Sequence, residues 1–334
     1  MDRILIVTDA WLPQVNGVVK TLQNTAAELE RLGHTVGFLT PENFRTLPCP
    51  TYPDIRLSLC TKGSVARLID AFRPDALHIS TEGPLGWAAR GVALDRGWRF
   101  TTAYHTRFPE YVAARSPIPA SWMYKLLRRF HAPSAAVMAP TATIIRDLEA
   151  RRFANVVRWS RGVDHGVFSP EPASPRREQD PPVFLYAGRV AVEKNIEAFL
   201  DLKLPGEKWV AGGGPAVEPL RQRYPDATFF GMKTHAELAE IYRQARVFVF
   251  PSRTDTFGLV LVEAMACGLP VAAYPVPGPL DVVGEGPAGA LDEDLGAACR
   301  RALGLQAEDA VAHAAKFTWA AATGQFHKAL VTIR

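Results

Sequence analysis

Two carboxylate side chains, Asp255 and Glu263, lie on either side of a predicted helix start near the C-terminal end of the chain. Residues 246–250 form a short apolar run typical of a buried strand, and a helix is predicted over residues 259–267. Because the first N–H groups of a helix have no partner within the helix, the loop end at Gly258 is suited to binding phosphate. Acids on both sides of a bound phosphate suit sugar hydroxyls. The pattern therefore indicates a nucleotide sugar as the ligand, with hexose, diphosphate and ribose in a row.

A pair of cations supports this ligand. Arg189 follows a predicted strand at residues 183–188, and Lys194 is expected to open the next helix. Positive side chains beside a phosphate-binding helix end stabilise a nucleoside diphosphate as it leaves. The alternative is a structural ion pair, such as one between Lys194 and Glu193. A glycine turn around Gly213 follows the next strand and allows the backbone to come close to a nucleotide.

In the first half of the chain, His105 follows a predicted strand at residues 100–104. A neutral imidazole in that place can hydrogen-bond a sugar hydroxyl, whereas a single histidine without such neighbours is more often a structural residue. Gly17 lies in a loop, residues 13–18, between the first predicted strand and the first predicted helix. The loop lacks the three glycines of a dinucleotide-binding fingerprint, which argues against an NAD enzyme.

Residues 254–271 resemble retaining glycosyltransferase family 4, whose acid-x7-acid motif has the spacing of Asp255 and Glu263. The family usually has Glu at the first position, and Asp255 in its place is similar to a subgroup near sulfoquinovosyl-diacylglycerol synthases and lipid α-mannosyl- and glucosyltransferases. Residues 104–106 and the Arg-x4-Lys pair also match the family. The resemblance implies an α/β protein of the GT-B fold, with two facing Rossmann-like doubly wound domains and a cleft between them.

The resemblance also implies roles for individual residues. His105 and Asp255 would orient the hexose hydroxyls, while Arg189 and Lys194 would stabilise the departing diphosphate. Glu263 would bind the ribose hydroxyls. The other donor-binding positions that we expect are Gly17, Gly213, Gly231, Met232, Phe257, Gly258 and Leu259. With no obvious second nucleophile, retention favours attack on the face that the diphosphate leaves. We expect no metal and no other cofactor, because protein cations replace the metal.

The elements that must position these residues are strands alternating with helices, which predicts parallel sheets covered on both faces. Strands are predicted at residues 4–7, 35–39, 76–79, 100–104, 136–139 and 156–159, and in a second series at 183–188, 208–211, 228–230, 247–250 and 271–274. A proline-rich stretch, residues 169–182, separates the two series. We therefore expect an acceptor domain over residues 1–166, a nucleotide-sugar domain over residues 167–315, and a final helix within residues 316–334 that crosses back onto the first domain.

Length and composition fit two globular domains. The chain has 334 residues, of which 48% are hydrophobic and 22% charged. It contains no apolar run near the roughly 18 residues that a membrane-spanning helix needs. It begins with a charged pair and a short strand, a start unlike a signal peptide. The four cysteines form no C-x2-C pair, so we expect neither a zinc site nor a disulfide framework, and a cytoplasmic location.

Positive charge is concentrated in the first half. Residues 1–165 contain 21 Lys/Arg and 14 Asp/Glu, whereas the remainder contains 17 and 20. This excess is either a solvated surface or an attraction to an anionic membrane. Residues 122–130 mix aromatic and basic side chains, which fits either a helix at a membrane interface or one packed on its domain. We expect a peripheral protein at the inner face of the cytoplasmic membrane, without a nucleic-acid partner.

The sequence leaves two combinations of sugar donor and acceptor open. One transfers a hexose from UDP-glucose or UDP-glucuronate to a membrane lipid such as diacylglycerol, and the other is a GDP-mannose-dependent α-mannosyltransferase acting on a lipid or glycan. A glycoside hydrolase using the two acids would leave Arg189 and Lys194 unexplained. A non-catalytic two-lobed sugar-binding protein would not need a diphosphate clamp. A nucleotide-sugar epimerase of the same fold lacks the acid-x7-acid loop.

Overall fold

The computed structural model describes residues 2–14, 16–49, 52–113, 119–170 and 181–334. The chain divides into two compact units: unit 1 comprises Met1–Arg161 with Trp319–Arg334, and unit 2 comprises Gly162–Thr318. The sequence had placed the boundaries after residue 166 and near residue 316. Of the predicted linker, residues 171–180 lie outside the described residues. Among the described residues, no helix has the length and apolar character needed to cross a bilayer.

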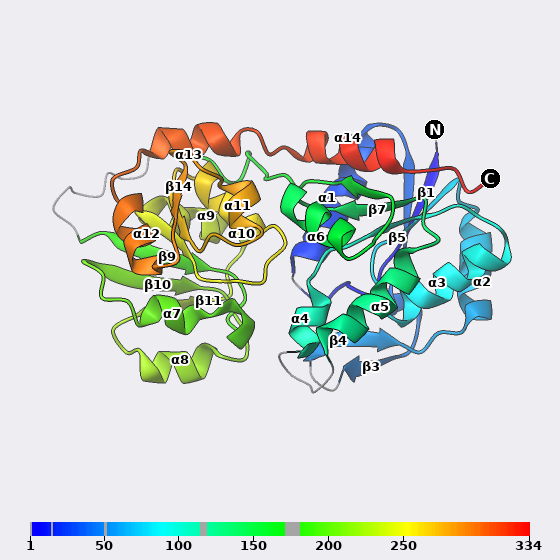
Figure 1. Ribbon diagram of the computed structural model, residues 1–334, viewed down its shortest axis with the longest axis horizontal. Helices are drawn as coiled ribbons and strands as arrows, with labels where there is room; N and C mark the ends of the chain where they lie inside the picture. Colours follow the sequence, from blue (N-terminus) through cyan, green and yellow to red (C-terminus); the bar gives the residue numbers. More distant parts are fainter. Residues whose placement is uncertain (1, 15, 50–51, 114–118, 171–180) are drawn as a thin grey trace. The chain divides into compact units, whose positions relative to one another are not determined.

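Unit 1 contains a six-stranded parallel sheet in the order β2-β1-β5-β6-β7-β8 (Figure 1). Its strands are β1 (Arg3–Val7), β2 (Thr35–Leu39), β5 (Ala76–Ile79), β6 (Thr101–Ala103), β7 (Ala136–Ala139) and β8 (Val156–Arg158), and an antiparallel hairpin pairs β3 (Thr46–Cys49) with β4 (Tyr52–Ser58). Its helices are α1 (Gly17–Arg31), the short 3-10 turn η1 (Pro41–Asn43), α2 (Lys62–Phe72), α3 (Pro84–Asp95), α4 (Phe108–Ala113), α5 (Ala120–His131), α6 (Ala142–Ala150) and α14 (Trp319–Ala329). The order reverses at β1, since β2 lies on one side of it and β5 on the other.

The start and the buried face of helix α1 are determined by its local sequence. The side chain of Asn16 accepts hydrogen bonds from the N–H groups of Val18 and Val19, both at 3.0 Å, and so caps the helix. Leu22 and Leu29 are fully buried on the face that meets the sheet. Helix α14 reaches unit 1 from the far end of the chain and lies beside α1, and its Phe326 joins the same buried cluster as Leu22 and Leu29 (Figure 1).

Unit 2 contains a second six-stranded parallel sheet, in the order β11-β10-β9-β12-β13-β14. Its strands are β9 (Val183–Ala187), β10 (Glu207–Ala211), β11 (Thr228–Gly231), β12 (Val247–Phe250), β13 (Val271–Ala273) and β14 (Gly289–Leu291). Its helices are the 3-10 turn η2 (Val192–Lys194), α7 (Ile196–Leu200), α8 (Val217–Arg223), α9 (His235–Gln244), α10 (Leu259–Ala266), α11 (Pro279–Val282), α12 (Leu295–Ala302) and α13 (Ala307–Ala314). The order reverses between β9 and β12, and in open α/β sheets ligands bind at the carboxyl ends of strands at such a reversal.

Both faces of this second sheet are covered. Along β9, Phe184 and Tyr186 belong to one buried apolar cluster and Leu185 and Ala187 to the other, because successive strand residues point to opposite faces. Helix α10 is apolar on nearly all sides, and its buried apolar residues from Leu261 onward belong to the cluster of Leu185 and Ala187. An apolar helix of this kind is stable only inside a core. It therefore provides a fixed support for the loop that precedes it.

Candidate functional site

Three of the predicted residues of unit 2 lie on neighbouring loops at the carboxyl ends of its strands. The N–H of Gly188 donates to Ala211 O at 2.9 Å, and the N–H of Gly212 donates to Gly231 O at 2.8 Å. These bonds place the loops after β9, β10 and β11 side by side, and with them Arg189, Gly213 and Met232. The loop after β12 joins the group through the side-chain amide of Asn195, which donates to Pro251 O at 3.1 Å.

Lys194 and Asp255 form an ion pair within this group of loops. Lys194 Nζ lies 2.6 Å from Asp255 Oδ1, and the side chains are only 18% and 17% exposed. The second oxygen of this carboxylate, Oδ2, is buried without a hydrogen-bonding partner among the described residues. Lys194 thus pairs with Asp255, another residue for which the sequence predicted a catalytic role. One oxygen of Asp255 is thus compensated by a cation, and the other faces no donor of the described chain.

The local structure around Lys194 differs from the expectation. Lys194 was predicted to open a helix, but it ends the 3-10 turn η2, and α7 begins two positions later at Ile196. Asn195 interrupts the helix because its backbone is left-handed, with φ of 54°. Asparagine adopts this conformation more readily than most residues. The break turns Lys194 toward the loop after β12, where the hydroxyl of Thr254 also contacts Glu193 O at 3.4 Å.

Phe257, Gly258 and Leu259 form the junction between this loop and α10. Gly258 precedes the first turn with φ of 83°, a left-handed conformation that favours glycine. Phe257 is 5% exposed and its ring packs against Phe317, with centroids 5.9 Å apart. Leu259 is the first residue of the helix, as predicted. The junction is thus held by an apolar side chain below, while its backbone N–H groups lie at the helix start.

Glu263 lies inside α10 and is 5% exposed. The hydroxyl of Tyr242 donates to its Oε2 at 3.4 Å. Burial, followed by the nearby charge of Glu263, raises the pKa of Tyr242 well above its ordinary value, so the phenol stays protonated and able to donate. Sequence reasoning did not find Tyr242, because a tyrosine in α9 has no local sign of a partner in α10.

The glycine turn after β10 is required by close backbone contact. A Cβ at Gly212 would lie 1.9 Å from Gly188 O, and the φ of Gly212 is 135°. A Cβ at Gly213 would lie 2.7 Å from Cγ of Met232, whose side chain is 63% exposed. Gly231 has φ of 70° and open space around its Cα. The predicted glycines therefore allow three loops to meet, with Met232 at their exposed side.

In unit 1, both ring nitrogens of His105 are hydrogen-bonded within the unit. Arg161 Nη2 donates to Nδ1 at 3.1 Å, and Nε2 lies 2.8 Å from Ser80 Oγ. A guanidinium only donates, so Nδ1 must accept and the ring proton is on Nε2, which donates to Ser80. Burial, followed by the charge of Arg161, lowers the pKa of His105 well below its ordinary value. His105 is therefore neutral, as expected, but a sugar hydroxyl at either nitrogen would have to replace a protein partner.

Arg161 is a buried cation that contacts several groups of this part of unit 1. It is 5% exposed, its guanidinium lies 4.5 Å above the ring of Trp159, and Nη1 donates to Ser160 O at 2.9 Å and to Trp159 O. Burial lowers its pKa to about 9. No carboxylate pairs with it among the described residues. Residue type and spacing give no sign of this contact, and only the fold shows that Arg161 reaches His105.

The other predicted positions of unit 1 have structural partners. Gly17 is the first residue of α1, and its carbonyl accepts from Thr21 Oγ1 at 2.6 Å, so the structure shows a capped helix start at this point. Glu82 Oε1 lies 3.1 Å from Nε2 of His131. Asp9, which the sequence did not indicate, accepts from the N–H groups that begin α3, and burial raises its pKa.

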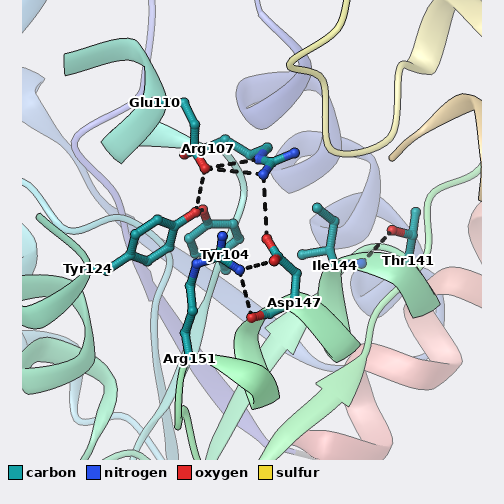
Figure 2. A network of polar contacts seen from close by, with 8 residues as sticks. All are labelled: Tyr104, Arg107, Glu110, Tyr124, Thr141, Ile144, Asp147 and Arg151. Carbon is teal, nitrogen blue, oxygen red and sulfur yellow. Dashed lines mark hydrogen bonds and ion pairs between the residues drawn. The ribbon is translucent and has the colours of Figure 1, made fainter. Parts of the chain in front are cut away.

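A second polar network ties the loop after β6 to α5 and α6, as Figure 2 shows. Tyr124 donates to Glu110 Oε1 at 2.7 Å, and Arg107 pairs with the same oxygen at 3.1 Å. Arg107 also lies 3.5 Å from Asp147 Oδ2, and Asp147 pairs with Arg151. Helix α5 is thus packed on its domain through Tyr124, which was one of the two interpretations of residues 122–130. Its opposite face is exposed.

Comparison with known proteins identifies the class of enzyme. Residues 15–167 match the family Glycosyltransferase Family 4, and residues 168–294 match Glycosyl transferases group 1. Two solved structures share the fold over 98% of this chain. Sucrose-phosphate synthase from Thermosynechococcus elongatus has a TM-score of 0.75 and 20% sequence identity, and the match covers 98% of its chain. Anabaena HepE in complex with UDP-glucose has a TM-score of 0.72 and 17% sequence identity, and the match covers 99% of its chain. The two six-stranded sheets are those of the GT-B fold, which confirms the predicted fold class.

Curated relatives cover most of the chain. It is 32% identical to a sulfoquinovosyl transferase of Arabidopsis thaliana over 84% of the chain, and spans 61% of that relative's length. It is 30% identical to a GDP-mannose-dependent alpha-mannosyltransferase of Mycolicibacterium smegmatis, covering 84% of the chain and 82% of the relative. It is 27% identical to an alpha-monoglucosyldiacylglycerol synthase of Streptococcus pneumoniae, over 90% of the chain and 78% of the relative. The chain belongs to the family 4 glycosyltransferases and is an enzyme that transfers a sugar.

Proposed function

We propose that the enzyme transfers a hexose from a UDP-sugar to a membrane lipid such as diacylglycerol, with retention of anomeric configuration and without a metal or other cofactor. The observation that carries the donor half of this proposal is the Lys194–Asp255 pair at 2.6 Å in front of α10. A partly buried acid suits a hexose hydroxyl when one of its oxygens is compensated and the other has no donor among the described residues. The paired lysine suits the phosphate bonded to that hexose.

Each part of the donor has a group suited to it in unit 2. Arg189, Lys194 and the N–H groups at the start of α10 provide positive charge for the diphosphate, where charge develops as the bond to the sugar breaks. Glu263, with its carboxylate held by Tyr242, suits the ribose hydroxyls. Because protein cations stabilise the leaving group, the reaction does not require a metal. The departing phosphate oxygen is then the base nearest to the acceptor hydroxyl, which gives attack on the same face and retention.

The exposed face of α5 supports a lipid acceptor. Trp122 and Leu126 are 68% and 45% exposed, and Lys125 and Arg129 are exposed on the same stripe of the helix. Exposed aromatic and aliphatic side chains among cations are typical of a helix that lies in a membrane interface. Each Lys or Arg near an anionic surface contributes about 1 kcal/mol. We infer peripheral attachment at an anionic membrane through this face, in agreement with the lipid product in the name of the Streptococcus pneumoniae relative.

A second candidate is a GDP-mannose-dependent α-mannosyltransferase. The specific observation in its favour is the Mycolicibacterium smegmatis relative, of which the chain covers 82% at 30% identity. The candidates differ in the base and the hexose, which are chosen by the exposed side of the Gly231–Met232 turn and by Asp255. The diphosphate and ribose contacts are common to both.

The test is stabilisation by nucleotides, followed by transfer. A ligand at one hundred times its Kd adds about 2.7 kcal/mol of stability, so UDP or GDP should raise the Tm of unit 2 clearly. Lys194→Met should abolish the shift, while Lys203→Met, an exposed lysine, should leave it unchanged. The nucleotide that stabilises the protein selects the sugar donors to test on diacylglycerol vesicles, and NMR of the product gives its anomeric configuration. No shift with any nucleotide would refute the donor site, and an inverted product would refute the mechanism.

A further inference from the structure

Three side chains with metal-binding groups meet at the amino ends of β1 and β2 in unit 1. Asp2 precedes β1, His34 lies in the turn between α1 and β2, and His327 lies in α14. We propose that these residues form a binding site for one divalent transition-metal ion, of the class of Zn²⁺, and that the ion fastens α14 to the start of β1. The site is separate from the transfer reaction and does not depend on the proposed function.

The distances are close to those of a metal site. Asp2 Oδ2 lies 3.2 Å from His34 Nδ1 and 3.9 Å from His327 Nε2. One donor atom from each of the three residues lies within 4.8 Å of the others, and the imidazole centroids are 4.5 Å apart. With bonds of about 2.0–2.1 Å, the ligand atoms of a tetrahedral Zn²⁺ ion lie roughly 3.3 Å from one another. Small rotations of the Asp2 and His327 side chains would bring the donor atoms to that separation.

The fold brings these residues together for reasons that involve the backbone. β1 and β2 are parallel neighbours with Arg3 opposite Thr35, so the residues just before each strand, Asp2 and His34, are also adjacent. The N–H of Thr35 donates to Asp2 O at 3.0 Å and holds this register. α14 lies against α1, which precedes the turn, and this contact delivers His327 to the same place. The three positions are therefore set by strand pairing and helix contact, and not by the side chains alone.

The donor set selects the class of metal. Two imidazoles and one carboxylate suit Zn²⁺, Ni²⁺ or Co²⁺, whereas Mg²⁺ and Ca²⁺ prefer oxygen ligands. The side chains of His34, Asp2 and His327 are 12%, 50% and 42% exposed, so an ion has direct access from solvent and water can complete its coordination. The bond that now uses the lone pair of His34 Nδ1, from the N–H of Asp2, is long at 3.4 Å and easily replaced.

The place of the site in the sheet indicates a structural role. Asp2 and His34 lie at the amino ends of β1 and β2, whereas in open α/β sheets ligands that react bind at the carboxyl ends. An ion here would connect the start of unit 1 to the helix that returns to it after all of unit 2. A link that closes so long a loop stabilises the folded unit, because the unfolded chain cannot hold the ligands together.

The experiment uses the full, untagged chain, treated with EDTA and dialysed. Zn²⁺ binding is measured by competition with a chromophoric chelator, and Co²⁺ absorption reports the coordination geometry. We expect one Zn²⁺ per chain, a rise in Tm of several degrees, and at least tenfold weaker binding in His34→Gln and His327→Gln. His165→Gln, which removes an exposed histidine of unit 2, should bind as the wild type. Hexosyl transfer should not change on adding or removing Zn²⁺.

Each other outcome overturns the proposal. If no Zn²⁺ binds at about 100 µM, the three groups are only an ion-pair cluster. If His34→Gln and His327→Gln bind as tightly as the wild type, the ion is held elsewhere. A general folding defect is separated from loss of the site by the metal-free Tm, which should be the same in the variants and the wild type. A Tm that falls equally with and without Zn²⁺ would assign the residues to packing and refute a metal site.

Discussion

His78 allows the interior of unit 1 to be tested without substrates. It is fully buried on β5, its Nδ1 lies 2.9 Å from Thr101 Oγ1, and its ring contacts Trp159 and Phe326 with centroids 5.7 and 4.8 Å apart. Burial, followed by the charge of Arg161, lowers its pKa from 6.5 to about 3. The perturbation that we consider is His78→Gln, which keeps a hydrogen-bonding group for Thr101 but cannot be protonated.

The sign and size follow from proton linkage. Between pH 6.5 and about 3, the unfolded chain binds a proton at residue 78 that the folded chain does not. Folding stability therefore decreases as the pH falls through this range, by about 1.4 kcal/mol per pH unit. From pH 7 to pH 5 the loss caused by His78 amounts to about 2 kcal/mol. His78→Gln removes this loss, so the difference in stability between variant and wild type should shift by that amount in favour of the variant.

The assay is urea unfolding at pH 7, 6 and 5, followed by tryptophan fluorescence. Trp209 is the one tryptophan of unit 2, so a Trp209→Phe background reports unit 1. Any proton taken up by the other histidines is common to both proteins and cancels in the difference. An equal pH dependence with and without His78→Gln would refute the reasoning, because His78 would then be protonated as easily in the folded chain as in the unfolded one. His165→Gln, at an exposed position, is the control and should retain the wild-type slope.

Three further predictions concern activity and membrane binding. Asp255→Asn should lower kcat by about 10²–10³ while UDP still raises the Tm. The control is Asp226→Asn, at an exposed position. A kcat of Asp255→Asn within threefold of wild type and equal to that of the control would show that Asp255 is not part of the site. Arg161→Gln removes the cation beside His105, so the pKa of His105 should rise and the acid limb of the kcat–pH profile should move to higher pH; an unmoved limb would contradict this role. Trp122→Ser should weaken binding to anionic vesicles about tenfold or more in a sedimentation assay, and unchanged sedimentation would exclude α5 as the attachment face.

Much of the fold follows from local pattern. The strands β2, β5, β7 and β12 lie at the predicted residues. In β7 and β12 every residue is apolar and buried, as expected for a strand covered on both faces. The hairpin of β3 and β4 was not predicted, since Pro48 and Pro53 interrupt those runs and proline is tolerated at an edge. β14 was also missed, because a three-residue strand containing Gly289 has little local signal.

The candidate site divides in the same way. The carboxylates, cations and glycines that suit a nucleotide sugar could be read from residue type and spacing alone. The resemblance of residues 254–271 to family 4 could be recognised in the same way, because the functional groups of a strand–loop–helix motif lie close together in the sequence. The break at Asn195, which turns Lys194 away from a helix start, could not be foreseen, since its left-handed backbone is one option among several for that residue.

The sequence by itself determined most of the elements, the class of enzyme and which residues carry charge or hydrogen-bonding groups. Only the tertiary structure decided the partners of those groups. Lys194 pairs with Asp255 because β9 and β12 are neighbours in the sheet of unit 2. Arg161 donates to His105 because β6 and β8 are parallel strands of the sheet of unit 1, so their carboxyl ends lie on the same side of it. The physical reason is range: helix and strand formation depend on residues a few positions apart, whereas the charge, burial and tautomer of a side chain depend on whatever the order of strands brings beside it.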